Sequence, residues 1–301
     1  FNNENLPSIS ILTPTLNAGR VLEDCLASIA MQDYPRELIE IIVADGGSSD
    51  NTLEIAKKFG ARIFDNPLKT AEAGKAVALK QASNELVALI DSDNILPQKD
   101  WFRKMMAPFN SPEIIGAEPL AYTWRSTDGF ITRYCALIGM NDPLVLFLGN
   151  YDRMSVLTGV WTELELEQND RGGYLEITLH RGLLPTLGAN GTILRRDFLT
   201  EAGVGDYLFD IDVIYDFINR GEGEIPKKFA KVKIGIVHLY CGSDVGQFIR
   251  KQKRRVRDYL YYEKLGIRKY PWRIFSMGSM RGRGMLFFIF ATVTVLPLLL
   301  Q

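Results

Sequence analysis

The feature that most constrains the fold is an alternation of strand-like and helix-like segments over the first hundred residues. Short β-branched or apolar runs occur at residues 8–13, 40–44, 61–64 and 86–90. Segments with helical spacing lie between them, at residues 20–31, 52–59 and 71–82. This order predicts an α/β fold with a mostly parallel central sheet and helices on both faces. Ligands of such folds bind at the carboxyl ends of the strands, so the polar loops there should carry the chemistry.

The composition is that of a folded protein. The chain has 301 residues, of which 47% are hydrophobic and 24% charged, and no short period recurs, which excludes disordered, collagen-like and solenoid classes. Its three cysteines form no CxxC pair, so the sequence indicates neither a disulfide framework nor a cysteine zinc site. We therefore expect a reducing, cytosolic setting.

The remaining two thirds of the chain are less regular. Strands are expected at residues 114–120, 174–179 and 234–240, a turn and then a strand at 187–196, and helices at 198–203, 210–220 and 245–265. We expect one domain over residues 1–240, with halves at 1–100 and 101–240, followed by helices at 241–284.

The C-terminal part combines strong positive charge with an apolar run. Residues 250–283 hold twelve Lys or Arg against Asp258 and Glu263, a net charge of +10, so the remainder of the chain carries −11. Tyr270 and Trp272, with Ile274 and Phe275, are interleaved with these basic residues, and residues 285–300 then carry no charge. A buried core helix is the alternative, but the basic neighbourhood favours the start of a transmembrane segment at 285–301 and contact with anionic phospholipid, not nucleic acid. The N-terminus has no basic region followed by an apolar one, so no signal peptide is expected.

Two loops at predicted strand ends carry acidic residues. In DGGSSDNT (residues 45–52), the glycines permit a sharp turn and a serine or aspartate can cap the next helix, or Asp45 can accept hydrogen bonds from a nucleotide base. Asp91 and Asp93 follow an apolar run in DSDN (residues 91–94). Paired acids at a buried strand end repel one another unless a cation lies between them, which favours Mg²⁺ or Mn²⁺ over a solvated turn.

These motifs resemble family 2 glycosyltransferases. PTLN (14–17), DGGSSDNT, GKAVALKQA from Gly74 and LIDSDN from Leu89 occur in the order and spacing of that family. The resemblance implies a GT-A fold that transfers a sugar from a nucleoside diphosphate with inversion. It implies a catalytic domain over residues 1–240, with a nucleotide-binding half at 1–100 and an acceptor half at 101–240, so the basic helices at 241–284 are expected to be juxtamembrane. The nucleotide-sugar-binding residues that it implies are Thr13, Pro14, Thr15, Asn17, Asp45, Gly46, Gly74, Lys75, Asp91, Ser92 and Asp93.

The same resemblance extends loosely into the second half. In GANGTILRR it implies acceptor-side roles for Gly188, Asn190 and Arg195. Asp210 and Asp212 stand where the family has an acidic pair that includes the catalytic base, although Phe209 replaces the usual Glu; we favour Asp210. His238 resembles a histidine that joins Asp91 and Asp93 on the metal, and a histidine satisfied at a strand end is the alternative.

The sequence therefore predicts a membrane-associated, metal-dependent inverting glycosyltransferase with its catalytic domain facing the cytoplasm. Its acceptor is expected to be a polyprenyl-(di)phosphate-linked lipid or glycan at the membrane surface. A nucleotidyltransferase is one alternative, but that class would require a glycine-rich loop with Arg and Lys after the first strand, which TPTLNAGR lacks. A non-catalytic membrane scaffold is the other, and metal-dependent binding of a nucleoside diphosphate would distinguish it.

Overall fold

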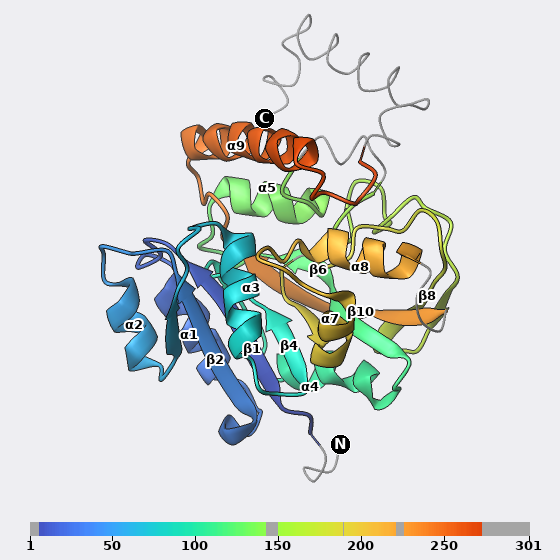
Figure 1. Cartoon of the computed structure of the whole chain (residues 1–301), viewed down its shortest axis with the longest axis horizontal. Coiled ribbons are helices and arrows are strands. Elements are labelled where there is room, and N and C mark those ends of the chain that lie inside the picture. The colour runs from blue at the N-terminus through green and yellow to red at the C-terminus, as the bar shows by residue number, and fades with distance from the viewer. Residues whose placement is uncertain (1–5, 143–149, 189, 221–225, 273–301) are drawn as a thin grey trace, which may run out of the picture.

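The computed structural model describes residues 6–142, 150–188, 190–220 and 226–272 (Figure 1). Ten strands within these ranges form one sheet. They are β1 (Ile9–Thr15), β2 (Ile39–Asp45), β3 (Arg62–Asp65), β4 (Leu86–Leu89), β5 (Asn94–Ile95), β6 (Ile114–Thr123), β7 (Gln168–Asp170), β8 (Tyr174–Leu179), β9 (Thr192–Arg195) and β10 (Lys227–His238). Their order is β3-β2-β1-β4-β9-β6-β10-β8-β7, with β5 paired to β10.

The sheet is mixed, but most of its strands run one way. β2 and β4 lie parallel to β1 on its two sides, β3 is parallel to β2, and β10 is parallel to β6. β9 lies antiparallel between β4 and β6, and β5 and β8 are antiparallel to β10. The predicted mostly parallel α/β sheet is thus confirmed, and β9 joins the strands of the first hundred residues to those that follow.

Helices cover both faces of the sheet, as predicted (Figure 1). They are α1 (Leu22–Ala30), α2 (Thr52–Lys58), α3 (Ala71–Gln81), α4 (Trp101–Met106), α5 (Phe130–Ile138), α7 (Arg196–Ala202), α8 (Asp210–Arg220) and α9 (Val245–Lys264), with 3₁₀ turns η2 (Arg36–Leu38) and η3 (Ala107–Asn110). Ile9 and Ile11 of β1 pack with α1 and α4 in one core cluster, whereas Leu12 packs with α3, α7 and α8 in the other. This alternation follows from the two-residue period of a strand.

Strand β10 is longer than the sequence predicts. It begins at Lys227, whereas the prediction starts at residue 234. The four lysines at 227, 228, 231 and 233 interrupt the apolar pattern from which a strand is predicted. Lys231 nevertheless lies fully buried, since its Nζ is 2.5 Å from Glu118 Oε1 on the neighbouring β6. The sequence analysis also assigns no helix at α5, which the structure contains.

The basic helix predicted at 245–265 is confirmed as α9. Residues 273–301, which include Arg273, Ile274, Phe275 and the apolar segment 285–301, lie outside the described residues. No helix of the described residues combines the length and the hydropathy needed to span a bilayer.

Candidate active site

The loops that follow β1 and β2 are bonded to each other. Asn17, with a left-handed φ of 51°, donates its backbone N–H to Ser48 Oγ at 2.8 Å. Its side-chain Oδ1 accepts from the backbone N–H of Ser49 at 2.9 Å, and Ala18 N donates to Thr52 Oγ1 at 2.8 Å. Asparagine tolerates this backbone conformation better than most residues do. The predicted nucleotide-binding loops therefore form one rigid unit.

The Asp45 carboxylate organises the second of these loops. Its Oδ1 accepts from Thr15 Oγ1 at 2.7 Å and from Ser48 Oγ at 2.6 Å, and its Oδ2 accepts from the backbone N–H of Gly47 and Ser48. Burial alone would raise the pKa of Asp45, but the bonds from Ser48, Thr15 and Gly47 hold it below its usual range. Gly46, which directly follows Asp45, donates its N–H to Thr15 O at 2.8 Å. Asp45 is thus kept ionised at a strand end.

Helix α3 links these loops to the acids. A Cβ on Gly74 would lie 2.7 Å from Pro14 Cβ, so only glycine lets α3 approach β1 beside buried Thr13 this closely. The next residue, Lys75, places its Nζ 2.9 Å from Asp210 Oδ2 and 3.7 Å from Asp91 Oδ1. Burial alone would lower the pKa of Lys75, but these carboxylates raise it, so the ammonium is retained.

The two acids of DSDN face different partners, with half-buried Ser92 between them. Burial raises the pKa of Asp91, and its buried Oδ1 accepts no hydrogen bond from the described residues. Asp93 Oδ1 lies 3.3 Å from His238 Nε2. Burial alone would raise the pKa of Asp93 too, but the His238 ring holds it below its usual range. The pairing of β5 with β10 creates this contact, since Asn94 is the register partner of His238.

The predicted three-ligand set of Asp91, Asp93 and His238 is not assembled in the structure. Among the described residues, no three His, Cys, Asp or Glu side chains come close enough together to hold a metal ion. The reason is that Asp91 is drawn toward Lys75. Two ligands do converge: the 3.3 Å between Asp93 Oδ1 and His238 Nε2 is near the roughly 2.9 Å between adjacent ligands of an octahedral Mg²⁺. A divalent cation held by this pair, with the remaining oxygens supplied by a diphosphate, fits these residues.

The two candidate bases have different surroundings. Asp210, at the first position of α8, keeps 21% of its side chain exposed and pairs with Lys75 beside Asp91. Asp212 is buried and accepts from Arg268 Nη2 at 2.7 Å and from the backbone N–H of Lys269 and Tyr270. Asp212 therefore holds the segment that follows α9, and Asp210 is the acid that faces the DSDN loop.

Asp212→Asn should lower the free energy of unfolding by about 1.5–3 kcal/mol, because hydrogen bonds to a charged group are lost in a buried setting. Denaturant unfolding followed by circular dichroism measures this. Asp258→Asn is the matched control, since its pair with Arg254 is exposed and should contribute below about 1 kcal/mol. Equal effects of the two substitutions would contradict the anchoring role of Asp212.

Two of the three predicted acceptor-side residues lie beside the site, and the third lies at the other end of β9. A Cβ on Gly188 would lie 2.8 Å from Asp210 Cβ, and Asn190 Nδ2 lies 3.0 Å from His238 Nδ1, so both adjoin the site. Arg195 does not: β9 is antiparallel to β4, which places Thr192 beside Leu89 and Arg195 beside Leu86 at the far end of the strand. There Arg195 donates to the carbonyl oxygens of Ile114, Phe109 and Ser111. The structure thus places Arg195 away from Gly188 and Asn190, because β9 runs antiparallel to β4.

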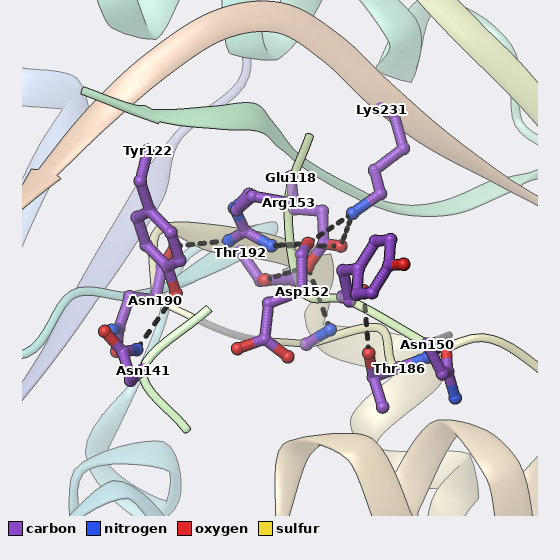
Figure 2. A network of polar contacts seen from close by, with 12 residues as sticks. Glu118, Tyr122, Asn141, Asn150, Asp152, Arg153, Thr186, Asn190, Thr192 and Lys231 are labelled. Carbon is purple, nitrogen blue, oxygen red and sulfur yellow. Dashed lines mark hydrogen bonds and ion pairs between the residues drawn. The ribbon is translucent and has the colours of Figure 1, made fainter. Parts of the chain in front are cut away.

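A buried network next to the site was missed by the sequence analysis (Figure 2). Glu118, Arg153 and Lys231 are all 0% exposed. Glu118 Oε1 is 2.5 Å from Lys231 Nζ and 3.2 Å from Arg153 Nη1, and its Oε2 accepts from Gly188 N and Thr192 Oγ1, both at 2.9 Å. Burial alone would raise the pKa of Glu118, but the two cations hold it below its usual range.

This network holds the backbone of two residues that adjoin the site, Gly188 and Asn190. Arg153 donates to Asn190 O at 2.7 Å, and the Asn190 side chain contacts His238. Glu118 binds the backbone of Gly188, the glycine that packs on Asp210. In the sequence, Glu118 is a single acid within an apolar run and Lys231 is one of four lysines between residues 227 and 233, so neither identifies its partner.

Part of this chain is similar in sequence to known glycosyltransferases. Residues 10–134 match the model of the family described as glycosyl transferase family 2. The chain is 28% identical over 105 residues to the glycosyltransferase AglE of Haloferax volcanii, covering 33% of this chain and 34% of AglE. It is 36% identical over 93 residues to the poly(ribitol-phosphate) beta-N-acetylglucosaminyltransferase TarS of Staphylococcus aureus, covering 29% of this chain and 16% of TarS. The resemblance stated from the motifs is thus confirmed for residues 10–134.

Among solved structures, the mannosyltransferase PcManGT of Pyrobaculum calidifontis, in complex with GDP-Man and Mn²⁺, aligns with 70% of this chain and 51% of its own. The TM-score is 0.46 and the sequence identity 17%. This chain spans about a third of AglE and less of TarS. The predicted enzyme class, a glycosyltransferase, agrees with the family match and with the names of both relatives.

Proposed function

We propose that this protein is an inverting glycosyltransferase that transfers a sugar from a nucleoside diphosphate to an acceptor at the cytoplasmic face of a membrane. The observation that carries the proposal is the position of Asp210, which shares Lys75 with Asp91 of the DSDN loop, within a chain whose residues 10–134 match the family 2 model. The proposed fold type is GT-A.

The donor would bind at the carboxyl ends of β1, β2 and β4. The bonded loops at Asn17 and Asp45 offer backbone and carboxylate groups to a base and ribose. Asp93 and His238 would hold Mg²⁺ or Mn²⁺, which when bound neutralises negative charge on the departing diphosphate. Asp91, which lies 3.7 Å from Lys75 Nζ, keeps a buried Oδ1 that accepts no hydrogen bond from the described residues and would accept one from the donor.

Asp210 would act as the general base. In a single displacement, an acceptor hydroxyl attacks the anomeric carbon opposite the diphosphate and must lose its proton to a group within hydrogen-bond reach. Lys75 Nζ, 2.9 Å from Asp210 Oδ2, orients this carboxylate. Gly188 keeps the space beside Asp210 free of a side chain.

The proposed acceptor is a polyprenyl-(di)phosphate-linked lipid or glycan. The support for it is the +10 charge of residues 250–283 and the uncharged run at 285–300. Positive charge next to an apolar run is typical of the cytoplasmic side of a membrane, where nucleotide sugars are available.

Donor binding tests the proposal. In a thermal-shift panel of nucleoside diphosphates and nucleotide sugars with Mn²⁺, at least one ligand should raise the unfolding temperature by a few degrees. Asp93→Asn and excess chelator should each remove this shift, since both remove the cation. Asp33→Asn, an exposed aspartate paired with Arg103, is the matched control. No metal-dependent shift with any ligand would contradict the proposal and favour a non-catalytic scaffold.

A further inference from the structure

The outward face of α5 is apolar, the reverse of what a solvent-facing helix normally shows. Its exposed positions are Phe130, Arg133, Tyr134 and Leu137, and Phe130 is 54% exposed. They include no acidic residue. The opposite side of α5 buries Ile131 and Cys135 against Cys241, so the helix is fixed in this orientation.

A short turn extends this apolar face. The backbone N–H of Val156 donates to Leu137 O at 2.8 Å, which fixes the turn at the end of α5. Val156 and Leu157 are 66% and 67% exposed, so both project outward where nothing in the described residues covers them. Two adjacent exposed aliphatic side chains at a turn are typical of membrane or protein contacts.

Helix α9 lies next to α5 (Figure 1). Ile131 N donates to Gly242 O just before α9, and Gln252 Nε2 donates to Asn141 O just after α5, so the two helices run side by side. Ile249, Val256 and Leu260 of α9 are each about half exposed. Their spacing of seven and four residues places them on one side of the helix.

Basic side chains flank this apolar stripe. Lys253 and Arg257 are exposed and lie four residues apart, one before and one after Val256 in the sequence. They take part in no ion pair within the described residues. Arg250 and Arg254, also largely exposed, have only long contacts of 3.9 and 3.7 Å to Asp244 and Asp258. An amphipathic helix with apolar residues beside Lys and Arg matches an interface between acyl chains and anionic headgroups.

We propose that the outward faces of α5 and α9, with the turn at Val156 and Leu157, dock on an anionic lipid bilayer. The basic residues decide between occupants: a second copy of this chain would bring two cationic helices together, whereas anionic headgroups complement them. This inference rests on the membrane location in the proposed function and deepens it, because both use the basic residues of α9. It does not depend on the sugar-transfer reaction, so vesicle binding and turnover can fail separately.

Environment-sensitive fluorescence tests the position of the surface. Leu157→Cys in the full chain, labelled with an NBD fluorophore, should show a blue shift and a gain in intensity on addition of vesicles of phosphatidylcholine with phosphatidylglycerol. Met31→Cys, an equally exposed apolar position at the end of α1, should show neither. The native Cys25, Cys135 and Cys241 are buried, which favours labelling at the introduced thiol.

Vesicle affinity tests the charge. Lys253→Gln with Arg257→Gln should weaken binding to these vesicles about 25-fold, since each basic residue near an anionic surface contributes about fivefold. Lys57→Gln, at an exposed lysine of α2, should leave the affinity unchanged. The loss should vanish with vesicles of phosphatidylcholine alone, and circular dichroism should match wild type in each variant.

Three outcomes would overturn the proposal. A blue-shifted label at position 157 before vesicles are added would mean that residues 273–301 cover the surface. A blue shift that depends on protein concentration without vesicles would mean that a second copy covers it. An unshifted label at position 157 in vesicle-bound protein would mean that another part of the chain makes the contact.

Discussion

Asp210→Asn is expected to lower turnover by about 10²–10⁴-fold, the usual contribution of a positioned general base. The substitution keeps the shape of the side chain but removes its ability to take a proton. Lys75 would retain Asp91 as its partner at 3.7 Å, so the donor side should keep its arrangement. Steady-state assay of nucleoside diphosphate release, together with the thermal shift caused by the donor, separates the two properties.

The controls for Asp210 are two other aspartates. Asp206→Asn, in an exposed pair with Lys80, should leave turnover unchanged. Asp212→Asn should lower stability and leave the proton-transfer step in place below its unfolding temperature. A loss of less than tenfold in Asp210→Asn would contradict its role as base and would indicate an acceptor that is already ionised, such as a lipid phosphate.

Glu118→Gln is expected to lower the free energy of unfolding by about 3–5 kcal/mol, the cost of leaving buried charge without its partner. Glu118 Oε1 contacts both buried cations, at 2.5 Å from Lys231 Nζ and 3.2 Å from Arg153 Nη1. The glutamine side chain has nearly the same volume as that of glutamate but carries no charge. Denaturant unfolding of wild type and variant measures the difference.

The matched control is Glu23→Gln, whose pair with Lys58 is exposed and should contribute below about 1 kcal/mol. The pH dependence gives a second criterion. Because the pKa of Glu118 is lowered in the folded state, its contribution is present above the unfolded pKa of about 4.3 and is lost as pH falls through the folded pKa. The free energy of unfolding of Glu118→Gln should therefore fall less than that of wild type as the pH is lowered. An equal fall in the two proteins would contradict this role.

The first hundred residues could be interpreted from the sequence because their chemistry is local. Asp45 and Asp91 each follow an apolar strand, and a parallel sheet brings such strand ends to one edge whatever the details of packing. The helix at α8 was equally clear, since its apolar face repeats with helical spacing.

The second half depended on contacts distant in sequence. β9 enters the sheet antiparallel, so Asn190 reaches His238 whereas Arg195, five residues later, lies at the opposite end of the strand. Asp212 pairs with Arg268, which lies 56 residues away in the sequence, and no local pattern indicates this contact. No local pattern indicates that Lys231 is buried, because its partner, Glu118, lies 113 residues earlier.

The most direct test of the whole account is the electron paramagnetic resonance signal of free Mn²⁺ titrated with this protein. The account predicts that the signal falls steeply only when a nucleoside diphosphate is also present, and that Asp93→Asn abolishes the fall, because two protein ligands and the diphosphate together complete the coordination. A nucleoside diphosphate that binds tightly without affecting the Mn²⁺ signal, or an Asp93→Asn protein that behaves as wild type, would contradict it.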